Sequence, residues 1–320
     1  MKRRAIVWFR QDLRLHDNEA LTNALRMADG VFPVYIFDER IFNGQTRFSF
    51  RKTDKFRARF IIECVTELRE NLRKVGGDLI VRVGRPEIIL SELAKEIKAS
   101  WVICNRERTQ EEVLVQDGLE TKLWGFGVEL IYTRGKMLYH TQDLPMPVQH
   151  TPDYFFQFRK ENEDITPVRE PLPSPTAIPP LPAGFDTGDI PGLQDFGYEP
   201  SENDTRAALE FKGGETEGLR RLRYYFWDKD LVATYKETRN GMIGGNYSSK
   251  FSPWLSQGCL SPKLIYHELK RYERERVSNE STHWLFFELL WRDFFRLMGK
   301  KHGNRIFLKG GVQNKPLRQL

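Results

Sequence analysis

The sequence predicts an α/β protein of two parts, an amino-terminal doubly wound parallel sheet domain and an all-helical domain, joined by a long linker. Three observations predict this fold. The first part alternates short β-rich runs with stretches of helical periodicity, a proline-rich stretch follows, and the remainder is helical without strand-like runs. With 320 residues, of which 40% are hydrophobic, the chain is long enough for two domains. We expect an α/β domain over 1–135, a linker over 136–202 and a helical domain over 203–320.

Five β-rich runs in the first part predict strands, and helical periodicity separates them. The runs are AIVWF at 5–9, FPVYIF at 32–37, DLIVRV at 78–83, WVIC at 101–104 and VELIY at 128–132, and the helical stretches are 18–28, 56–75, 86–98 and 111–124. Strands and helices in alternation, with short connections, are typical of a parallel sheet covered on both faces. No glycine fingerprint follows the first strand, where the sequence is RQDLRLHDN at 10–18. The usual dinucleotide site of such sheets is therefore not predicted.

Proline-rich sequence predicts the linker, and helix-capping patterns predict the helical part. EPLPSPTAIPPLPAGFDTGDIPG at 170–192 has prolines and glycines too dense for a helix or central strand, and we expect it to run along the surface. Ser261 and Pro262 predict a helix start, as do Ser252 and Pro253, with the serine as N-cap and the proline as first helical residue. The segment 282–301 is apolar on nearly every face, which predicts a buried helix.

Composition bounds the function. The three cysteines, Cys64, Cys104 and Cys259, form no CxxC pair, which argues against a disulfide framework or zinc site and fits a reducing, cytoplasmic location. No apolar run is long enough for a membrane span, and no metal-binding HExxH, GxSxG or phosphate-loop motif is present. The net charge of +6 permits a polyanionic partner but does not require one.

The stretch NYSSKFSPW at 246–254 predicts a candidate anion site. Ser248, Ser249, Lys250 and Ser252 gather at a predicted helix start, where unpaired N–H groups carry partial positive charge and would suit a phosphate. The alternative is an ordinary helix cap beside a solvated lysine. Local sequence leaves both interpretations open.

A second candidate site lies in the predicted helix 282–301. Residues three and four apart share a helix face, so the indoles of Trp284 and Trp291 and the charges of Glu288 and Arg292 fall on one stripe with Phe295. One interpretation is a structural ion pair between Glu288 and Arg292. The other is a functional site, because a buried pair contributes little net stability.

The segment RRLRYYFWDKDLVATYKETRNGM at 220–242 interleaves basic and aromatic residues. Cations for phosphates beside rings for stacking are what a groove for unstacked bases needs. A solvated amphipathic helix would have a similar pattern.

Several long segments, in the same order, resemble the photolyase and cryptochrome family, and among it the DASH cryptochromes. They are VWFRQDLRLHDNEAL at 7–21, PDYFFQFRKENE at 152–163, the stretch from GGETEGL at 213–219 through to IYHEL at 265–269, and STHWLFFELLWRDFF at 281–295. The resemblance implies an α/β domain, a surface linker and a helical domain that holds FAD, in agreement with the predicted organisation.

The resemblance also implies roles for individual residues. Those that correspond to flavin contacts are Tyr235, Ser248, Ser249, Lys250, Phe251 and Ser252, with Arg292 as a cofactor or substrate contact. Arg239 is similar to a DNA-contacting position. Glu288 resembles the carboxyl group that hydrogen-bonds the damaged bases, and Trp291 the indole that packs against them. Gln110 and Glu111 lie where the family holds an antenna, which is methenyltetrahydrofolate in many DASH members.

The implied activity is light-dependent repair of cyclobutane pyrimidine dimers, preferentially in single-stranded DNA, by electron transfer from reduced FAD. The alternatives are a blue-light photoreceptor without repair activity and a nucleic-acid-binding protein with an incomplete flavin site. Relatives continue beyond the position of Leu320, so the resemblance implies that this sequence holds the first part of the FAD pocket. We expect no membrane partner and a monomer.

Overall fold

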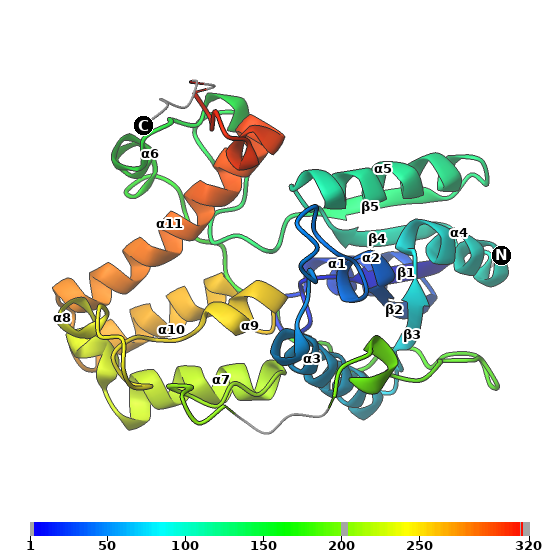
Figure 1. The fold of residues 1–320 in the computed structure, drawn as a ribbon, viewed down its shortest axis with the longest axis horizontal. Helices are drawn as coiled ribbons and strands as arrows, with labels where there is room; N and C mark the ends of the chain where they lie inside the picture. The colour runs from blue at the N-terminus through cyan, green and yellow to red at the C-terminus, as the bar shows by residue number, and fades with distance from the viewer. Residues whose placement is uncertain (1–2, 200–203, 314, 316–320) are drawn as a thin grey trace.

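A computed structural model describes residues 3–199, 204–313 and 315 (Figure 1). The five strands are β1 (Arg4–Phe9), β2 (Gly30–Asp38), β3 (Ile80–Gly84), β4 (Trp101–Asn105) and β5 (Glu129–Thr133). They form one parallel sheet in the order β3-β2-β1-β4-β5, with the chain reversing its direction of winding at β1. This doubly wound topology confirms the predicted fold class.

Helices cover both faces of the sheet because successive residues of its central strand point to opposite sides. Ala5, Val7 and Phe9 of β1 pack into the core that contains α1 and α3, whereas Ile6 and Trp8 pack against α4 and α5. These helices are α1 (Glu19–Met27), α3 (Lys55–Lys74), α4 (Pro86–Ile97) and α5 (Gln110–Trp124), and a short α2 (Glu39–Phe42) follows β2. The core on the α1 and α3 side continues into the helical region.

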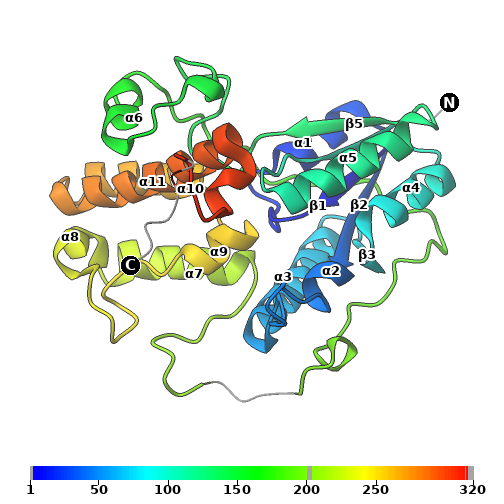
Figure 2. The ribbon, with the colours of Figure 1, turned by 45° about the horizontal axis from the view of Figure 1, so that its top comes forward.

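The connection after β5 contains α6 (Phe155–Asn162) and then runs extended through the proline-rich stretch. It is held to the surface of the α/β region by backbone hydrogen bonds, from Ile178 N to Val75 O at 2.7 Å and from Val81 N to Thr187 O at 2.8 Å. Arg69 of α3 donates to the carbonyls of Thr187 and Gly188. Figure 2 shows the connection passing from the α/β region toward α7.

The helical region begins with α7 (Glu215–Arg223) and ends with α11 (Glu280–His302) and a 3₁₀ turn, η5 (Gly303–Phe307). Between them lie a π-helical turn, η3 (Tyr224–Asp228), a 3₁₀ turn, η4 (Leu231–Thr234), and the helices α8 (Tyr235–Thr238), α9 (Ser252–Gln257) and α10 (Pro262–Glu275). Ser261 caps α10 as predicted, since its hydroxyl accepts from the N–H groups of Lys263 and Leu264. No helix in the described ranges is both long and apolar enough to span a membrane.

The loop after β1, which carries no glycine fingerprint, binds the helical region of the same chain. Arg14 donates to the Gly258 carbonyl at 2.7 Å, and Leu13 N donates to Gln257 O at 3.1 Å. Asp17 forms an ion pair with Lys263 at 2.7 Å. The place where many parallel sheets bind a dinucleotide is therefore used for contact between the two regions.

Candidate functional site

The loop between α8 and α9, residues 245–251, is held from one side by a single arginine. The Arg221 guanidinium donates to three loop carbonyls, those of Gly245 at 2.5 Å, Ser248 at 3.1 Å and Ser249 at 3.0 Å. Phe251 anchors the far end of the loop because its ring is buried. Burial lowers the pKa of Arg221, and its donors satisfy carbonyl groups that would otherwise lack partners. The conformation of the loop is therefore set by residues outside it.

The loop presents an unused set of donors. Lys250 has a φ of 57° and the following Phe251 a φ of −73°, a change of sign that forms a concave turn of the kind that binds anions through its N–H groups. Within the described ranges, the Lys250 ammonium and the hydroxyls of Ser248, Ser249 and Ser252 have no hydrogen-bond or ion-pair partner. A cation, three hydroxyls and a concave turn fit the diphosphate part of FAD.

The predicted cap at this position is wrong by one residue. Helix α9 begins at Ser252 itself, and the preceding Phe251 occupies the N-cap position without a side-chain cap bond. Pro253 is thus the second helical residue, and the Ser252 hydroxyl does not cap the helix. The hydroxyl stays exposed beside Lys250, which leaves it available to a ligand.

Two aromatic rings, those of Tyr225 and Tyr235, lie beside the loop. The ring of Tyr225 is 6.0 Å from Phe251 and 6.4 Å from Tyr235, between centroids, so it joins the loop to α8. The Tyr225 hydroxyl is buried and has no partner among the described residues, which is uncommon for a native protein. Burial, and secondarily the charge of Glu288, raise the pKa of Tyr235 to about 12, so this phenol is neutral at physiological pH.

Glu288 on α11 faces α8, where the structure places its partner. The Glu288 carboxylate accepts from the Arg239 guanidinium at 2.6 Å, and Arg239 also lies 4.9 Å from the centroid of the Trp284 ring. The interpretation of Glu288 and Arg292 as a structural ion pair, one of the two left open by the sequence, is therefore wrong. Both side chains of the observed pair are about one third exposed, at 33% for Glu288 and 28% for Arg239.

Arg292 and Trp291 lie on different sides of α11. Arg292 donates to Lys136 O at 2.9 Å and Leu255 O at 3.4 Å, which ties α11 to α9 and to the segment after β5. Burial lowers its pKa to about 10, which still leaves the group charged at neutral pH. The Trp291 indole instead stacks on Phe155 of α6, with centroids 3.7 Å apart and planes at 11°.

The predicted stripe on α11 is therefore divided, and the helix is not buried all round. Phe295 is 63% exposed, and Trp284, Glu288 and Trp291 are half-buried. Trp284 and Glu288 face α8, Trp291 faces α6, and Arg292 faces α9. The structure brings Glu288, Arg239 and Tyr235 together, and it separates Arg292 from them.

The basic residues of 220–242 are largely neutralised by nearby groups. Most pair with a carboxylate, as in Arg220–Glu217, Arg223–Asp228, Lys236–Glu280 and Arg239–Glu288, while Arg221 binds carbonyls. The segment is also not one amphipathic helix, because α7, the π-helical turn, a 3₁₀ turn and α8 follow one another. A segment that interleaves basic and aromatic residues therefore does not by itself form an open basic groove.

Gln110 and Glu111 lie at the first turn of α5, in the α/β region. Glu111 pairs with Lys52 at 2.8 Å, and both Gln110 and Glu111 are exposed. Among the described residues, neither side chain forms a hydrogen bond or ion pair with the loop 245–251 or with α11.

Sequence reasoning missed two residues of the site, Arg221 and Tyr225. Both stand in the run RRLRYYFW, which gave a signal for basic and aromatic character but not for which side chain turns inward. Their contacts are to residues about 10 to 28 positions away, so no local pattern identifies them.

The chain combines a parallel α/β sheet, a long extended connection and a helical region whose loop 245–251 has the geometry of an anion site, and this is a two-part class of protein. The family model of DNA photolyase matches residues 5–177. The chain is 47% identical over 308 residues to cryptochrome DASH of Gloeobacter violaceus, covering 96% of this chain and 61% of the relative. It is 48% identical over 313 residues to cryptochrome DASH of Synechocystis sp., covering 97% and 63%.

The structure agrees with the sequence comparison. A crystal structure of Synechocystis sp. cryptochrome matches with a TM-score of 0.93 at 46% identity, over 98% of this chain and 65% of that one. The chain belongs to the photolyase/cryptochrome family and is of the DASH type. It spans about three fifths of the length of these curated relatives.

Proposed function

We propose that this chain supplies the phosphate-binding side of an FAD site and takes part in light-dependent repair of cyclobutane pyrimidine dimers in single-stranded DNA. The observation that carries the proposal is the loop 245–251 with the adjoining Ser252, where Lys250 and three serine hydroxyls have no partner among the residues that the structure describes. Family membership supports the same cofactor and a DNA substrate. The proposed location is the cytoplasm.

The residues around the loop have separate proposed roles in holding the cofactor. Lys250, Ser248, Ser249 and Ser252 would hold the diphosphate, while Arg221 keeps the loop in shape. Phe251 and Tyr235 would exclude water from one side of the cofactor, because both rings are buried. FAD, when bound and reduced, supplies the light-driven electron.

The substrate side is the face of α11 next to α8. We propose that Glu288 hydrogen-bonds the damaged bases and that Arg239 then contacts a DNA phosphate. The two groups are each about one third exposed and neutralise each other, so substrate would compete with their mutual hydrogen bond. Trp291 would pack against the dimer, and Arg292 would support α11 and α9 beneath it. Methenyltetrahydrofolate near Gln110 and Glu111 remains the proposed antenna.

Charge reversal at Lys250 tests the cofactor proposal. Lys250→Glu replaces a charge-assisted contact by repulsion, so FAD affinity of the 320-residue chain should fall at least about tenfold. Flavin fluorescence titration measures the affinity, and thermal unfolding checks the fold. The matched control is Lys98→Glu, because Lys98 has a similar positive φ of 52° at the end of α4, remote from the loop.

The control separates backbone strain from loss of a phosphate contact. Lys98→Glu should leave FAD affinity unchanged while sharing any cost of changing a lysine at positive φ. Equal FAD affinity in wild type and Lys250→Glu, or no FAD affinity in the wild-type chain, would contradict the proposal.

A further inference from the structure

We propose that residues 43–59, a hairpin followed by the first turn of α3, form a second surface that binds single-stranded nucleic acid. The segment contains six basic residues and one acidic residue, and the whole chain has a net charge of only +6. Most of the excess positive charge of the protein is therefore concentrated in this one place. The inference goes beyond the repair site on α11, because it concerns a different surface on the α/β region.

The hairpin holds two rings away from the core. Gln45 and Arg51 form an antiparallel bridge, Thr46 N donates to Phe50 O at 2.7 Å, and Ser49 turns the tip with a φ of 63°. Phe48 is 65% exposed and Phe50 is 70% exposed. Rings held at that exposure by a hydrogen-bonded turn are available for stacking without reorganising the fold.

The cations of the segment lie beside the rings. The Arg47 guanidinium is 4.7 Å from the Phe48 ring centroid, and the Lys55 ammonium is 5.2 Å from that of Phe56. Lys52 and Arg59 form ion pairs with carboxylates, those of Glu111 and Glu63. Within the described ranges, the other four basic residues have no carboxylate within ion-pair distance: Arg47, Arg51, Lys55 and Arg57. In 220–242, by contrast, carboxylates neutralise most of the basic residues.

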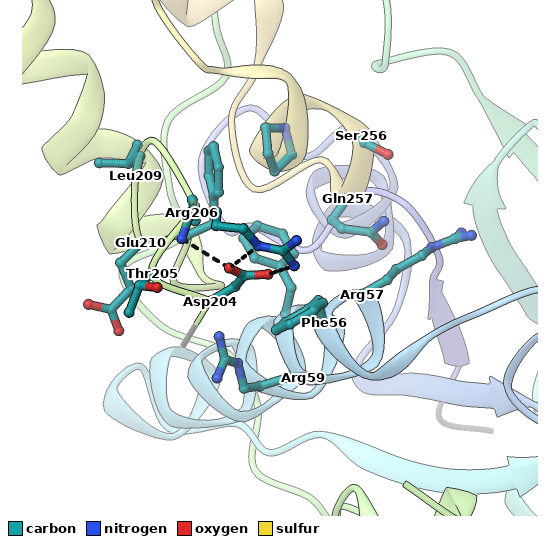
Figure 3. A pocket seen from close by; sticks show the side chains of 14 residues that line it. Phe56, Arg57, Arg59, Asp204, Thr205, Arg206, Leu209, Glu210, Ser256 and Gln257 are labelled. Atoms are coloured by element: carbon teal, nitrogen blue, oxygen red, sulfur yellow. Dashed lines mark hydrogen bonds and ion pairs between the residues drawn. The ribbon is translucent and has the colours of Figure 1, made fainter. Parts of the chain in front are cut away.

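A cavity continues the surface beyond the hairpin. It has a volume of about 840 Å³ and is lined by the start of α3, by residues 204–211 and by α9 (Figure 3). Phe56, Phe60 and Phe211 supply aromatic walls, and Arg57 lies at the same helix start. This volume is within the range of small-molecule sites and accommodates a nucleotide turned out of a strand. Rings, cations and cavity thus follow one another from the hairpin tip into α3.

The same elements argue against a membrane. A loop that enters a bilayer needs its apolar side chains together on one convex tip, but here Arg47 lies over the Phe48 ring, Lys55 lies over the Phe56 ring, and Phe56 lines a concave cavity. Alternation of rings and cations instead matches the alternation of bases and phosphates along an unpaired strand. Because rings and cations do not read the ribose hydroxyl, the surface suits unpaired DNA and RNA alike.

The test removes the rings and the charges separately. One variant combines Phe48→Ala with Phe50→Ala, and a second combines Arg47→Glu with Lys55→Glu. The probes are undamaged, fluorescently labelled oligothymidylate and oligouridylate of about 12 nucleotides, titrated in the dark over a salt series. Trp124→Ala, on an exposed indole at the end of α5, controls for the rings, and Arg85→Glu, on an arginine paired with Glu39, controls for the charges.

The ring variant should lose affinity at least about tenfold, with little change in the salt slope. The charge variant should reduce the slope of log affinity against log salt by about 1 to 2. Both controls should bind like wild type. A loss of affinity for only one of the two probes also supports the surface, and it identifies the bound strand as DNA or as RNA.

Two results would overturn the inference. One is wild-type affinity for both probes in both variants, with thermal unfolding unchanged. The other is loss of binding to vesicles of phosphatidylcholine and phosphatidylserine in the ring variant while oligonucleotide binding stays the same, which would assign the hairpin to a membrane surface.

Discussion

At the scale of single residues, the exposed pair of Glu288 and Arg239 determines what the α11 face offers a ligand. Each group is about one third exposed, so solvent screens their attraction and the pair contributes at most about 1 kcal/mol to folding. A carboxylate that is dispensable for stability yet lies beside Tyr235 and Trp284 is suited to a ligand.

Glu288→Gln is the substitution that separates these roles. It keeps the shape and a hydrogen-bonding end but removes the charge, so the free energy of unfolding should change by no more than about 1 kcal/mol. If Glu288 binds damaged bases, the preference for an oligonucleotide that contains a thymine dimer over its undamaged counterpart should decrease several-fold. Competition binding with the two oligonucleotides measures the preference. Glu280→Gln, which removes the partner of Lys236 on the same helix, is the control.

Glu288 would have a structural role if the preference for the damaged oligonucleotide were unchanged. The same would follow if the free energy of unfolding fell by much more than about 1 kcal/mol. A double-mutant cycle with Arg239→Gln then gives the coupling of the pair directly.

Residue positions also show what sequence can predict. Ser261–Pro262 and Ser252–Pro253 have the same letters, and only the first serine caps its helix. Ser261 is buried and also donates to Asp17 of the α/β region, which orients its hydroxyl, whereas the Ser252 hydroxyl has no hydrogen-bond partner in the part of the chain that the structure describes. Similarly, Glu288 pairs with Arg239, which is 49 residues away, and not with Arg292, which is four residues along the same helix. Residue types and helix faces were predictable, but tertiary contacts decided the partners.

At the scale of elements, the five strands and the main helices were predicted to within a few residues, because each has a clear period and clear ends. The arrangement around α11 was not. Trp291 and Arg292 are sequence neighbours, and helix geometry alone places them about 100° apart. Which of them meets a ligand depends on α6 and α9, whose positions no local pattern specifies.

Helix α11 is joined to the α/β region by a buried cluster around Glu107. The Glu107 carboxylate contacts the Lys136 ammonium and lies 3.6 Å from Arg296 of α11. Burial opposes ionisation of Glu107, but Lys136, Arg10 and Arg296 outweigh it and lower its pKa to about 2. The cluster therefore joins the ends of β4 and β5 to α11 through charge.

The depressed pKa of Glu107 predicts a specific loss of stability in acid. A carboxyl group with a lower pKa in the folded than in the unfolded state stabilises the fold fully above its unfolded value, near 4.5, and the contribution is lost as pH falls toward about 2. Wild type should lose up to about 3 kcal/mol from this group across that window. Glu107→Gln should lack this component, although it is less stable at neutral pH. Urea unfolding at a series of acid pH values measures both.

Asp143→Asn is the control for the Glu107 experiment, because Asp143 pairs with Arg169 in a more exposed position. Hydrogen bonds from Arg169 also lower the pKa of Asp143, but solvent reduces their effect on stability. A pH dependence in Glu107→Gln as steep as in wild type would show that this cluster does not hold the regions together.

At the scale of the whole molecule, the loop after β1 connects the two regions. Its buried side chains reach across the boundary: Arg14 donates to Gly258, and Glu215 of α7 accepts from the N–H groups of Leu15 and His16. The missing glycine fingerprint gives no sign of the usual dinucleotide site at this loop. That the loop instead binds the other region could not be predicted, since each partner lies about 200 residues or more along the chain.

The last prediction concerns cooperativity and uses Arg14. This side chain is 1% exposed and donates to three carbonyls, those of Gly258, Asp17 and Gly135, so Arg14→Met leaves three buried acceptors without their donor. We expect a loss of about 3 to 5 kcal/mol in the free energy of unfolding. Because Gly258 belongs to the helical region, the two regions should also unfold less cooperatively, with a lower dependence on urea.

Arg4→Met provides the comparison, since Arg4 donates to Ile97 O at 2.7 Å and both residues belong to the α/β region. Urea unfolding followed by far-ultraviolet circular dichroism and by tryptophan fluorescence should give coincident transitions for wild type and Arg4→Met, and separate transitions for Arg14→Met. Coincident transitions in Arg14→Met, at a stability close to that of Arg4→Met, would mean that the regions are coupled by apolar packing alone. The shared core on the α1 and α3 side, which already continues from the sheet into the helical region, would then be sufficient to unite them.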